Sequence, residues 1–230
     1  MKLIIAKKRV FIIAAVIIFA GAILGVCCGV GASSVAFNQG EKVVVIDAGH
    51  GGIDAGVIGV ATSSKESDIN LAISRHLKSY FVAAGFKVVL TRTNNGGLYG
   101  SSSSGFKKRD MQKRKEIIVE CNADMVISVH QNFCPIPSRR GGTVFFDKNS
   151  ECGKELADRI QNSINNMDEC VSVNTALTGD YFMLKCTESP SVIVECGFLS
   201  NREDDKLLNS EEYQKKIAYA IFKGAVAYYG

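Results

Sequence analysis

The chain has 230 residues, of which 47% are hydrophobic, and a formal net charge of +4 at pH 7. This length supports one sizeable globular domain with an appendage. The four basic residues ahead of position 10 carry the whole excess charge, because 27 Lys and Arg less these four leaves 23, against 23 Asp and Glu. A balanced domain lacks the basic surface that phosphate contacts require, so no nucleic acid partner is expected.

The N-terminal segment predicts a membrane anchor. Residues 10–31 carry no charge and follow the basic cluster at residues 1–9. A spanning helix needs ~20 apolar residues, and a basic flank stays in the cytoplasm. We therefore expect a cytoplasmic basic segment at 1–9, a transmembrane anchor or signal-anchor at 10–31 and a linker at 32–41. Cleavage of a signal peptide and lipidation of Cys27 or Cys28 are alternatives, and all three place the following domain outside the cytoplasm.

The rest of the chain alternates short apolar runs with amphipathic stretches. Strands are predicted at residues 43–47, 86–91, 125–130, 142–147, 181–185 and 191–195, and helices at 68–84, 109–121, 150–166 and 210–229. Residues 94–105, rich in Asn, Gly and Ser, predict a loop. The alternation predicts an α/β fold: a single three-layer sandwich domain at 42–230, with a central, mostly parallel twisted sheet of about six strands flanked by helices, and preceded by the transmembrane helix.

Four side chains stand where a strand ends or a helix begins. His50 follows the first strand, Glu66 opens a helical segment, and His130 and Glu195 end two later apolar runs. Parallel sheets bind ligands at the carboxyl ends of their strands, so these side chains are expected to converge. Two imidazoles and a carboxylate make a catalytic zinc set with a position open for water, and a further carboxylate serves as general base. The pattern indicates a metal-dependent hydrolase.

Each of these residues also has a simpler interpretation. A histidine at a strand end can cap the strand by hydrogen bonding to a carbonyl group. An acidic residue such as Glu66 is expected near a helix N-terminus because of the helix dipole. Glu195 is costly to bury without a partner, so it either neutralises a cation or pairs with an arginine such as Arg92.

Other polar residues offer weaker signals. The basic run at 107–115 is interpreted as a solvated helix face, with contact to an anionic glycan as the alternative. Arg139 and Arg140 follow His130 closely enough to touch a substrate. The six cysteines after position 40 form no Cys-x-x-Cys pair, which argues against a zinc knuckle, and export would permit disulfides. A cysteine hydrolase using Cys196 or Cys134 is a minor alternative.

Several segments together resemble a known family. They are residues 47–52 (DAGHGG), 65–66 (KE), 90–92 (LTR), Arg109, Asn122, 128–132 (SVHQN) and 194–201 (VECGFLSN). With the rest of residues 42–229, they look like the zinc-dependent N-acetylmuramoyl-L-alanine amidases of the amidase 3 type. The chain departs mildly from the family pattern at Ala48, Gln131 and Cys196, where proline, alanine and leucine are usual.

The resemblance implies one Zn²⁺ per domain, bound by His50, Glu66 and His130, with Glu195 as the catalytic residue. It implies hydrolysis of the amide between N-acetylmuramic acid and L-alanine in peptidoglycan. Candidate substrate-binding residues are Asn132, Arg92, Arg139 and Arg140. The alternative is a non-catalytic peptidoglycan-binding or scaffolding protein with an amidase fold.

With one predicted membrane anchor and no recognised wall-binding repeat, the chain resembles the sporulation and germination members of the family. That likeness implies spore cortex maturation leading to muramic-δ-lactam, with the catalytic domain in the intermembrane space around the forespore. Because an exported amidase endangers its own wall, we also expect an activating accessory protein.

Overall fold

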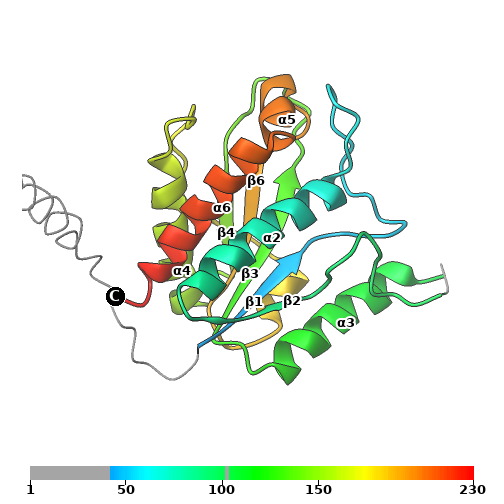
Figure 1. Ribbon diagram of the computed structural model, residues 1–230, viewed down its shortest axis with the longest axis vertical. Coiled ribbons are helices and arrows are strands. Elements are labelled where there is room, and N and C mark those ends of the chain that lie inside the picture. Colours follow the sequence, from blue (N-terminus) through cyan, green and yellow to red (C-terminus); the bar gives the residue numbers. More distant parts are fainter. Residues whose placement is uncertain (1–41, 102–103) are drawn as a thin grey trace, which may run out of the picture. The chain divides into compact units, whose positions relative to one another are not determined.

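The fold is built on one central sheet, shown in the computed structural model of Figure 1, which describes residues 42–101 and 104–230. The strands are β1 (Val43–Ala48), β2 (Lys87–Leu90), β3 (Met125–Asn132), β4 (Thr143–Phe146), β5 (Leu177–Thr178) and β6 (Ser191–Phe198). Within the described residues they form a six-stranded sheet in the order β2-β1-β3-β6-β4-β5. Neighbouring strands are parallel except β4 and β6, which are antiparallel. The predicted mostly parallel sheet is confirmed.

Helices cover both faces of this sheet, which confirms the three layers. Helices α2 (Glu66–Ala83), α4 (Glu151–Asn165) and α6 (Glu211–Val226) lie side by side on one face (Figure 1). On the other face lie α3 (Phe106–Glu120) and the 3₁₀-helix η1 (Phe182–Lys185). Successive β1 residues show the division, because side chains alternate across a strand: Val44 and Ile46 join the core under α2, α4 and α6, whereas Val45 packs toward α3 and η1.

The prediction of a strand at residues 181–185 is wrong. These residues form η1, and the Leu184 N–H donates to the Tyr181 carbonyl at 3.2 Å. A short apolar run does not distinguish a strand from a helical turn by periodicity. The sequence analysis also missed the two-residue strand β5 and the helix α5 (Arg202–Leu208).

The expected N-terminal features fall outside the described residues. The basic segment at 1–9, the anchor at 10–31 and the linker at 32–41 stay predictions. Among residues 42–101 and 104–230, no helix combines the length and the apolar character that a bilayer-spanning segment needs.

The sheet order sets the position of the functional site. Strands β1, β3 and β6 are parallel neighbours, so their carboxyl ends meet at one edge. Their register pairs His130 directly with Glu195. Helix α2 begins with Glu66, and β1 ends two residues before His50. The expected convergence of strand ends therefore occurs.

Candidate active site

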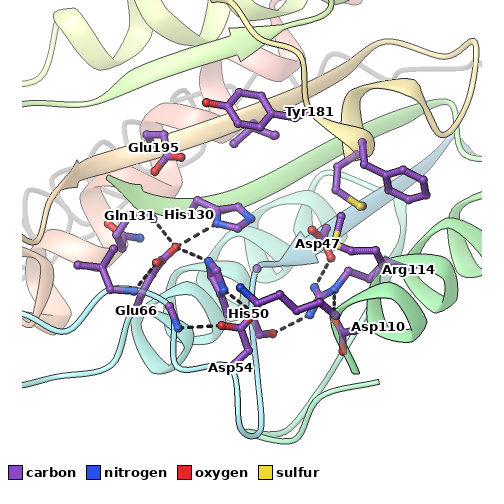
Figure 2. Close-up of a pocket in the computed structure, with 18 of the residues that line it drawn as sticks. Asp47, His50, Asp54, Glu66, Asp110, Arg114, His130, Gln131, Tyr181 and Glu195 are labelled. Atoms are coloured by element: carbon purple, nitrogen blue, oxygen red, sulfur yellow. Dashed lines mark hydrogen bonds and ion pairs between the residues drawn. The ribbon is translucent and has the colours of Figure 1, made fainter. Parts of the chain in front are cut away.

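Three predicted ligands meet at this edge. Glu66 Oε1 lies 3.2 Å from His50 Nε2 and 3.0 Å from His130 Nδ1 (Figure 2). One donor atom from each residue lies within 4.8 Å of the other two. Two imidazole nitrogens and a carboxylate oxygen at this spacing fit a divalent metal such as zinc. The donor set supports the metal site expected from the sequence.

Two glycines allow the ligands to approach the backbone. A Cβ added at Gly49 would lie 2.2 Å from Cε1 of His130, and one at Gly56 would lie 2.3 Å from Oε2 of Glu66. Both separations are shorter than atoms tolerate, so any side chain at these positions would displace a ligand. Gly56 also has a φ of +69°, a conformation that glycine adopts without strain.

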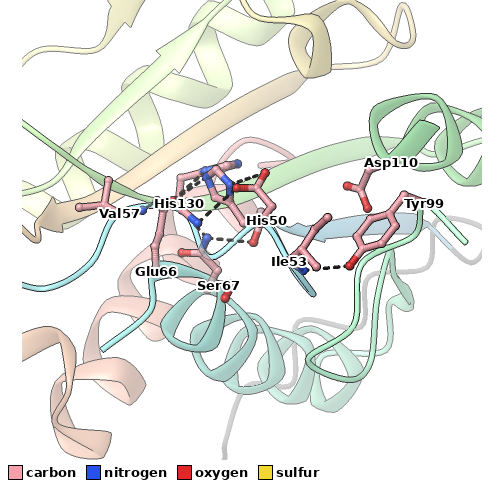
Figure 3. A network of polar contacts seen from close by, with 12 residues as sticks. His50, Ile53, Val57, Glu66, Ser67, Tyr99, Asp110 and His130 are labelled. Atoms are coloured by element: carbon pink, nitrogen blue, oxygen red, sulfur yellow. Dashed lines mark hydrogen bonds and ion pairs between the residues drawn. The ribbon is translucent and has the colours of Figure 1, made fainter. Parts of the chain in front are cut away.

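The carboxylate of Glu66 is buried and held at both oxygens. Oε2 accepts a hydrogen bond from the Val57 N–H at 2.8 Å (Figure 3). Oε1 accepts one from the Gln131 N–H at 3.1 Å. Burial by itself would raise the pKa of Glu66, but hydrogen bonds and charge from His130 and His50 outweigh it and lower the pKa well below the ordinary range. Glu66 is therefore ionised at neutral pH, as a metal ligand must be.

A buried amide pair extends the support of Glu66. Gln131 Nε2 donates to Asn70 Oδ1 at 3.1 Å, and Asn70 Nδ2 donates to Glu66 Oε1 at 3.3 Å and to the Gly49 carbonyl at 3.1 Å. Gln131 was noted in the sequence only as a departure from the usual alanine. In the structure the Gln131 side chain holds that of Asn70, and Asn70 in turn holds the Glu66 carboxylate.

Asp54 orients His50, and sequence reasoning missed it. Its Oδ2 lies 3.1 Å from His50 Nδ1, while Nε2 of the same ring faces Glu66 (Figure 2). Burial would lower the pKa of His50, but hydrogen bonds and charge from Glu66 and then Asp54 raise it. A carboxylate on the second ring nitrogen fixes the tautomer that a metal needs. An acidic residue four positions after His50 in the same glycine-rich loop was the available signal.

Arg114 of α3 holds the backbone that carries His50. Its guanidinium donates to the His50 carbonyl at 2.6 Å, to the Ala48 carbonyl at 2.7 Å and to Asp47 Oδ1 at 2.6 Å. Burial would raise the pKa of Asp47, but the charge of Arg114 and a hydrogen bond from Ser128 outweigh it and lower the pKa to about 2. His50 has a φ of +61°, an unfavourable conformation for a side-chain-bearing residue, so these contacts hold a strained turn.

Arg92 also holds the backbone of the loop before His50. The sequence had suggested instead that Arg92 pairs with Glu195 or binds substrate. It is 3% exposed, and its guanidinium donates to the carbonyls of Ala48 at 2.8 Å, Gly49 at 3.0 Å and Ser67 at 2.7 Å. It does not line the pocket or pair with Glu195. Its guanidinium is committed to the loop before His50.

The remaining substrate-binding candidates separate in the structure. Asn132 lines the pocket, whereas Arg139 and Arg140 do not. Arg140 Nε donates to the buried Asp204 at 2.9 Å, and Arg139 is exposed. Arg140 therefore has a structural partner away from the ligands.

Glu195 faces the same pocket without a partner. Its Oε2 atom is buried and accepts no hydrogen bond from the described residues. Burial raises the pKa of Glu195 to about 7, with Glu66 adding to the effect and the charges of His130 and His50 opposing it. A carboxylate that titrates near neutral pH suits a general base.

The pocket around these groups has a volume of about 620 Å³. Its lining includes Lys107, Met111 and Arg114 of α3, together with Tyr181 and Phe182. Sequence analysis placed Tyr181 in a strand and assigned it no role. A volume of this size can hold a drug-sized ligand rather than a single small group.

The cysteine chemistry does not favour a thiol enzyme. Cys196 is fully buried, and burial raises its pKa above the ordinary range, so the thiol stays protonated. Within the described residues all six cysteines are free.

Residues 44–227 match the family described as N-acetylmuramoyl-L-alanine amidase, Amidase_3. The chain belongs to this family. It is therefore an amidase that acts on peptidoglycan, and the enzyme expected from the motifs is confirmed over the scaffolding alternative.

Three similar proteins illustrate the relationship to this amidase. The germination-specific N-acetylmuramoyl-L-alanine amidase of Bacillus subtilis is 29% identical over 192 residues, covering 82% of this chain and 80% of the relative. The CwlD amidase from Clostridioides difficile, solved in complex with the GerS lipoprotein, is 36% identical with a TM-score of 0.79, covering 82% of this chain and 98% of that one. The amidase AmiC2 of Nostoc punctiforme is 30% identical with a TM-score of 0.70, over 83% and 98% of the chains.

Proposed function

We propose that this amidase is zinc-dependent and cleaves the amide between N-acetylmuramic acid and L-alanine, with Glu195 as its general base. The observation that carries the proposal is the convergence of three donor atoms beside a buried, unpartnered carboxylate oxygen. His50, Glu66 and His130 would hold the ion. When bound, zinc supplies a Lewis acid that activates water and polarises the scissile carbonyl.

Glu195 moves the proton in this scheme. Its Oε2 accepts a proton from the attacking water as the oxygen bonds to the carbonyl carbon. When the C–N bond breaks, the same oxygen returns the proton to the leaving nitrogen, because a deprotonated amine is a very poor leaving group. The products are a lactyl carboxyl group on the sugar and a free amino group on L-alanine.

The decisive experiment is mass spectrometry of peptidoglycan incubated with the zinc-loaded protein. We expect stem peptides with a free L-alanine amine and an intact glycan, and no product after chelation. Glu66→Ala should lose bound zinc together with activity, because it removes the ligand that both histidines face. Full zinc occupancy in that variant would remove Glu66 from the ligand set.

We further propose a role in spore cortex maturation that leads to muramic-δ-lactam. The support is the similarity to a germination-specific amidase and to CwlD. Deleting the gene in the source bacterium should abolish muramic-δ-lactam in spore peptidoglycan, as measured by muropeptide analysis. Spores with a normal lactam content would contradict this role.

We also propose that the domain acts outside the cytoplasm, anchored through residues 10–31, and with an accessory protein. The uncharged run supports the anchor, and the solved complex of CwlD with the GerS lipoprotein supports the accessory protein. Affinity purification of the full chain from sporulating cells should retain the accessory protein, and the purified complex should be more active than the isolated chain. Equal activity of the isolated chain and the complex would contradict activation by a partner.

A further inference from the structure

Tyr181 faces the active site from the side opposite the ligand loop. It lines the same pocket as Glu195, and Figure 2 shows its ring beside Glu195, across from Glu66 and Asp54. The residue is 43% exposed, so its phenol is accessible to a bound substrate. It directly precedes η1, whereas the proposed ligands come from the loop after β1, from α2 and from β3.

The ring of Tyr181 is fixed in place by its surroundings. It packs edge-on against Phe145 of β4, with ring centroids 5.6 Å apart and planes at 79°. A Cβ added at Gly179 would lie 2.4 Å from Cε2 of the ring, so the ring rests directly on the Gly179 backbone. The Tyr181 carbonyl accepts the first hydrogen bond of η1, from Leu184. An exposed side chain held this firmly is preorganised for contact with a ligand.

The hydroxyl group of Tyr181 is uncommitted. Among the described residues, no hydrogen bond joins it to another group, whereas the guanidinium of Arg114 and the amide nitrogen of Gln131 are engaged with the protein. Burial raises the pKa of Tyr181, and the neighbouring charge of Glu195 raises it further, so the phenol remains a proton donor at neutral pH.

Amide hydrolysis creates a need for such a donor. Attack of water on the carbonyl carbon moves negative charge onto the carbonyl oxygen, and fixed donors aimed at that oxygen stabilise the transition state. We propose that Tyr181 is a further catalytic residue, whose hydroxyl donates a hydrogen bond to the oxygen of the scissile carbonyl as this charge develops. The proposal rests on the amide hydrolysis proposed above and adds a protein donor to it.

The substitution Tyr181→Phe tests the hydroxyl alone, because the ring keeps its packing on Phe145 and Gly179. Loss of one such donor costs about 10²–10³-fold in kcat. We expect that loss in the zinc-loaded chain acting on peptidoglycan fragments, with KM, zinc affinity and Tm unchanged. Tyr219→Phe, which removes a hydroxyl from α6 outside the pocket, is the matched control and should change none of these values.

A binding measurement separates the transition state from the ground state. The probe is a tetrahedral phosphinate that replaces the muramoyl–alanine amide, and Tyr181→Phe should weaken its affinity by a factor similar to the loss in kcat. Affinity for the uncleaved amide, measured in a Glu195→Gln background, should not change.

Two results would overturn the role of Tyr181: a kcat within twofold of wild type, or equal losses of affinity for the amide and the phosphinate. An inactive wild-type protein would instead contradict the proposed hydrolysis. Phosphinate affinity would then still decide whether the hydroxyl contacts a tetrahedral centre.

Discussion

The position of Glu195 suits its proposed chemistry but lowers the stability of the folded protein. Its Oε2 atom is buried and unpartnered among the described residues, and it shares the pocket with the carboxylate of Glu66. A buried carboxylate without a hydrogen bond destabilises the fold, so its presence is best explained by function.

The substitution Glu195→Gln should therefore separate activity from stability. Turnover should fall about 10²–10⁴-fold, because the amide cannot accept a proton from water. In the folded protein, burial raises the pKa of Glu195 from 4.5 to about 7. The folded state thus retains a proton that the unfolded state releases, and the wild type loses stability as the pH rises from about 4.5 to 7.

In the absence of metal, the Glu195→Gln variant should not lose stability over this pH range. Its advantage in unfolding free energy over the wild type should grow between pH 5 and pH 8 by up to about 3 kcal/mol. Urea unfolding at both pH values measures the difference. An advantage that does not depend on pH would show that Glu195 does not titrate in this window.

Helix α3 is attached to the rest of the domain largely through charged side chains. The basic run at 107–115 predicted a solvated face, and the exposed Lys108 and Lys113 are consistent with that prediction. Arg114 differs, because it is 2% exposed and reaches through the core to the loop at His50. The fully or largely buried side chains of α3 are Asp110, Arg114 and Ile118, so polar contacts supply much of its attachment.

The substitution Arg114→Lys should weaken zinc binding without removing a ligand. Lysine keeps the charge, but its compact ammonium cannot reach the His50 and Ala48 carbonyls and both carboxylates in the fixed geometry of a guanidinium. Because groups that orient ligands typically contribute 10–100-fold to metal affinity, we expect a loss of that order in a chelator competition assay.

Arg140→Lys provides the control for this measurement. It alters an equivalent pair with the buried Asp204, outside the pocket. Zinc affinity should remain unchanged in this variant. Equal losses in both variants would indicate general destabilisation rather than a role for α3 at His50.

At the scale of the whole molecule, the metal should couple distant parts of the chain. Its proposed ligands come from the loop after β1, the start of α2 and the end of β3, so one ion would tie three segments together. A ligand at about 100 times its Kd that binds only the folded state stabilises by about 2.7 kcal/mol.

Adding zinc to the chelated protein should therefore raise Tm by several degrees, measured by circular dichroism. Magnesium should have little effect, because it prefers oxygen ligands. Glu66→Ala should abolish the shift and also controls for binding to the free cysteines. An unchanged Tm in the wild type would contradict a preformed zinc site.

The local sequence was sufficient to predict the α/β class and to place three of the four central residues at one edge of the sheet. Apolar strand runs were continuous because β1, β3 and β6 are buried on both faces, and His50, His130 and Glu195 stand where parallel strands end. Glu66 needed the family resemblance, since an acidic helix start is common.

Only the tertiary structure decided how these residues are supported. The tasks of Asp54, Arg92 and Arg114 depend on which carbonyls and ring nitrogens the folded chain brings within hydrogen-bonding reach. Tyr181 likewise reaches the pocket because its segment turns into η1 instead of a strand, and packs on Phe145 and Gly179. The physical reason is that strand periodicity and strand ends are local properties, whereas the partners of a long polar side chain are chosen by contacts between segments far apart in the sequence.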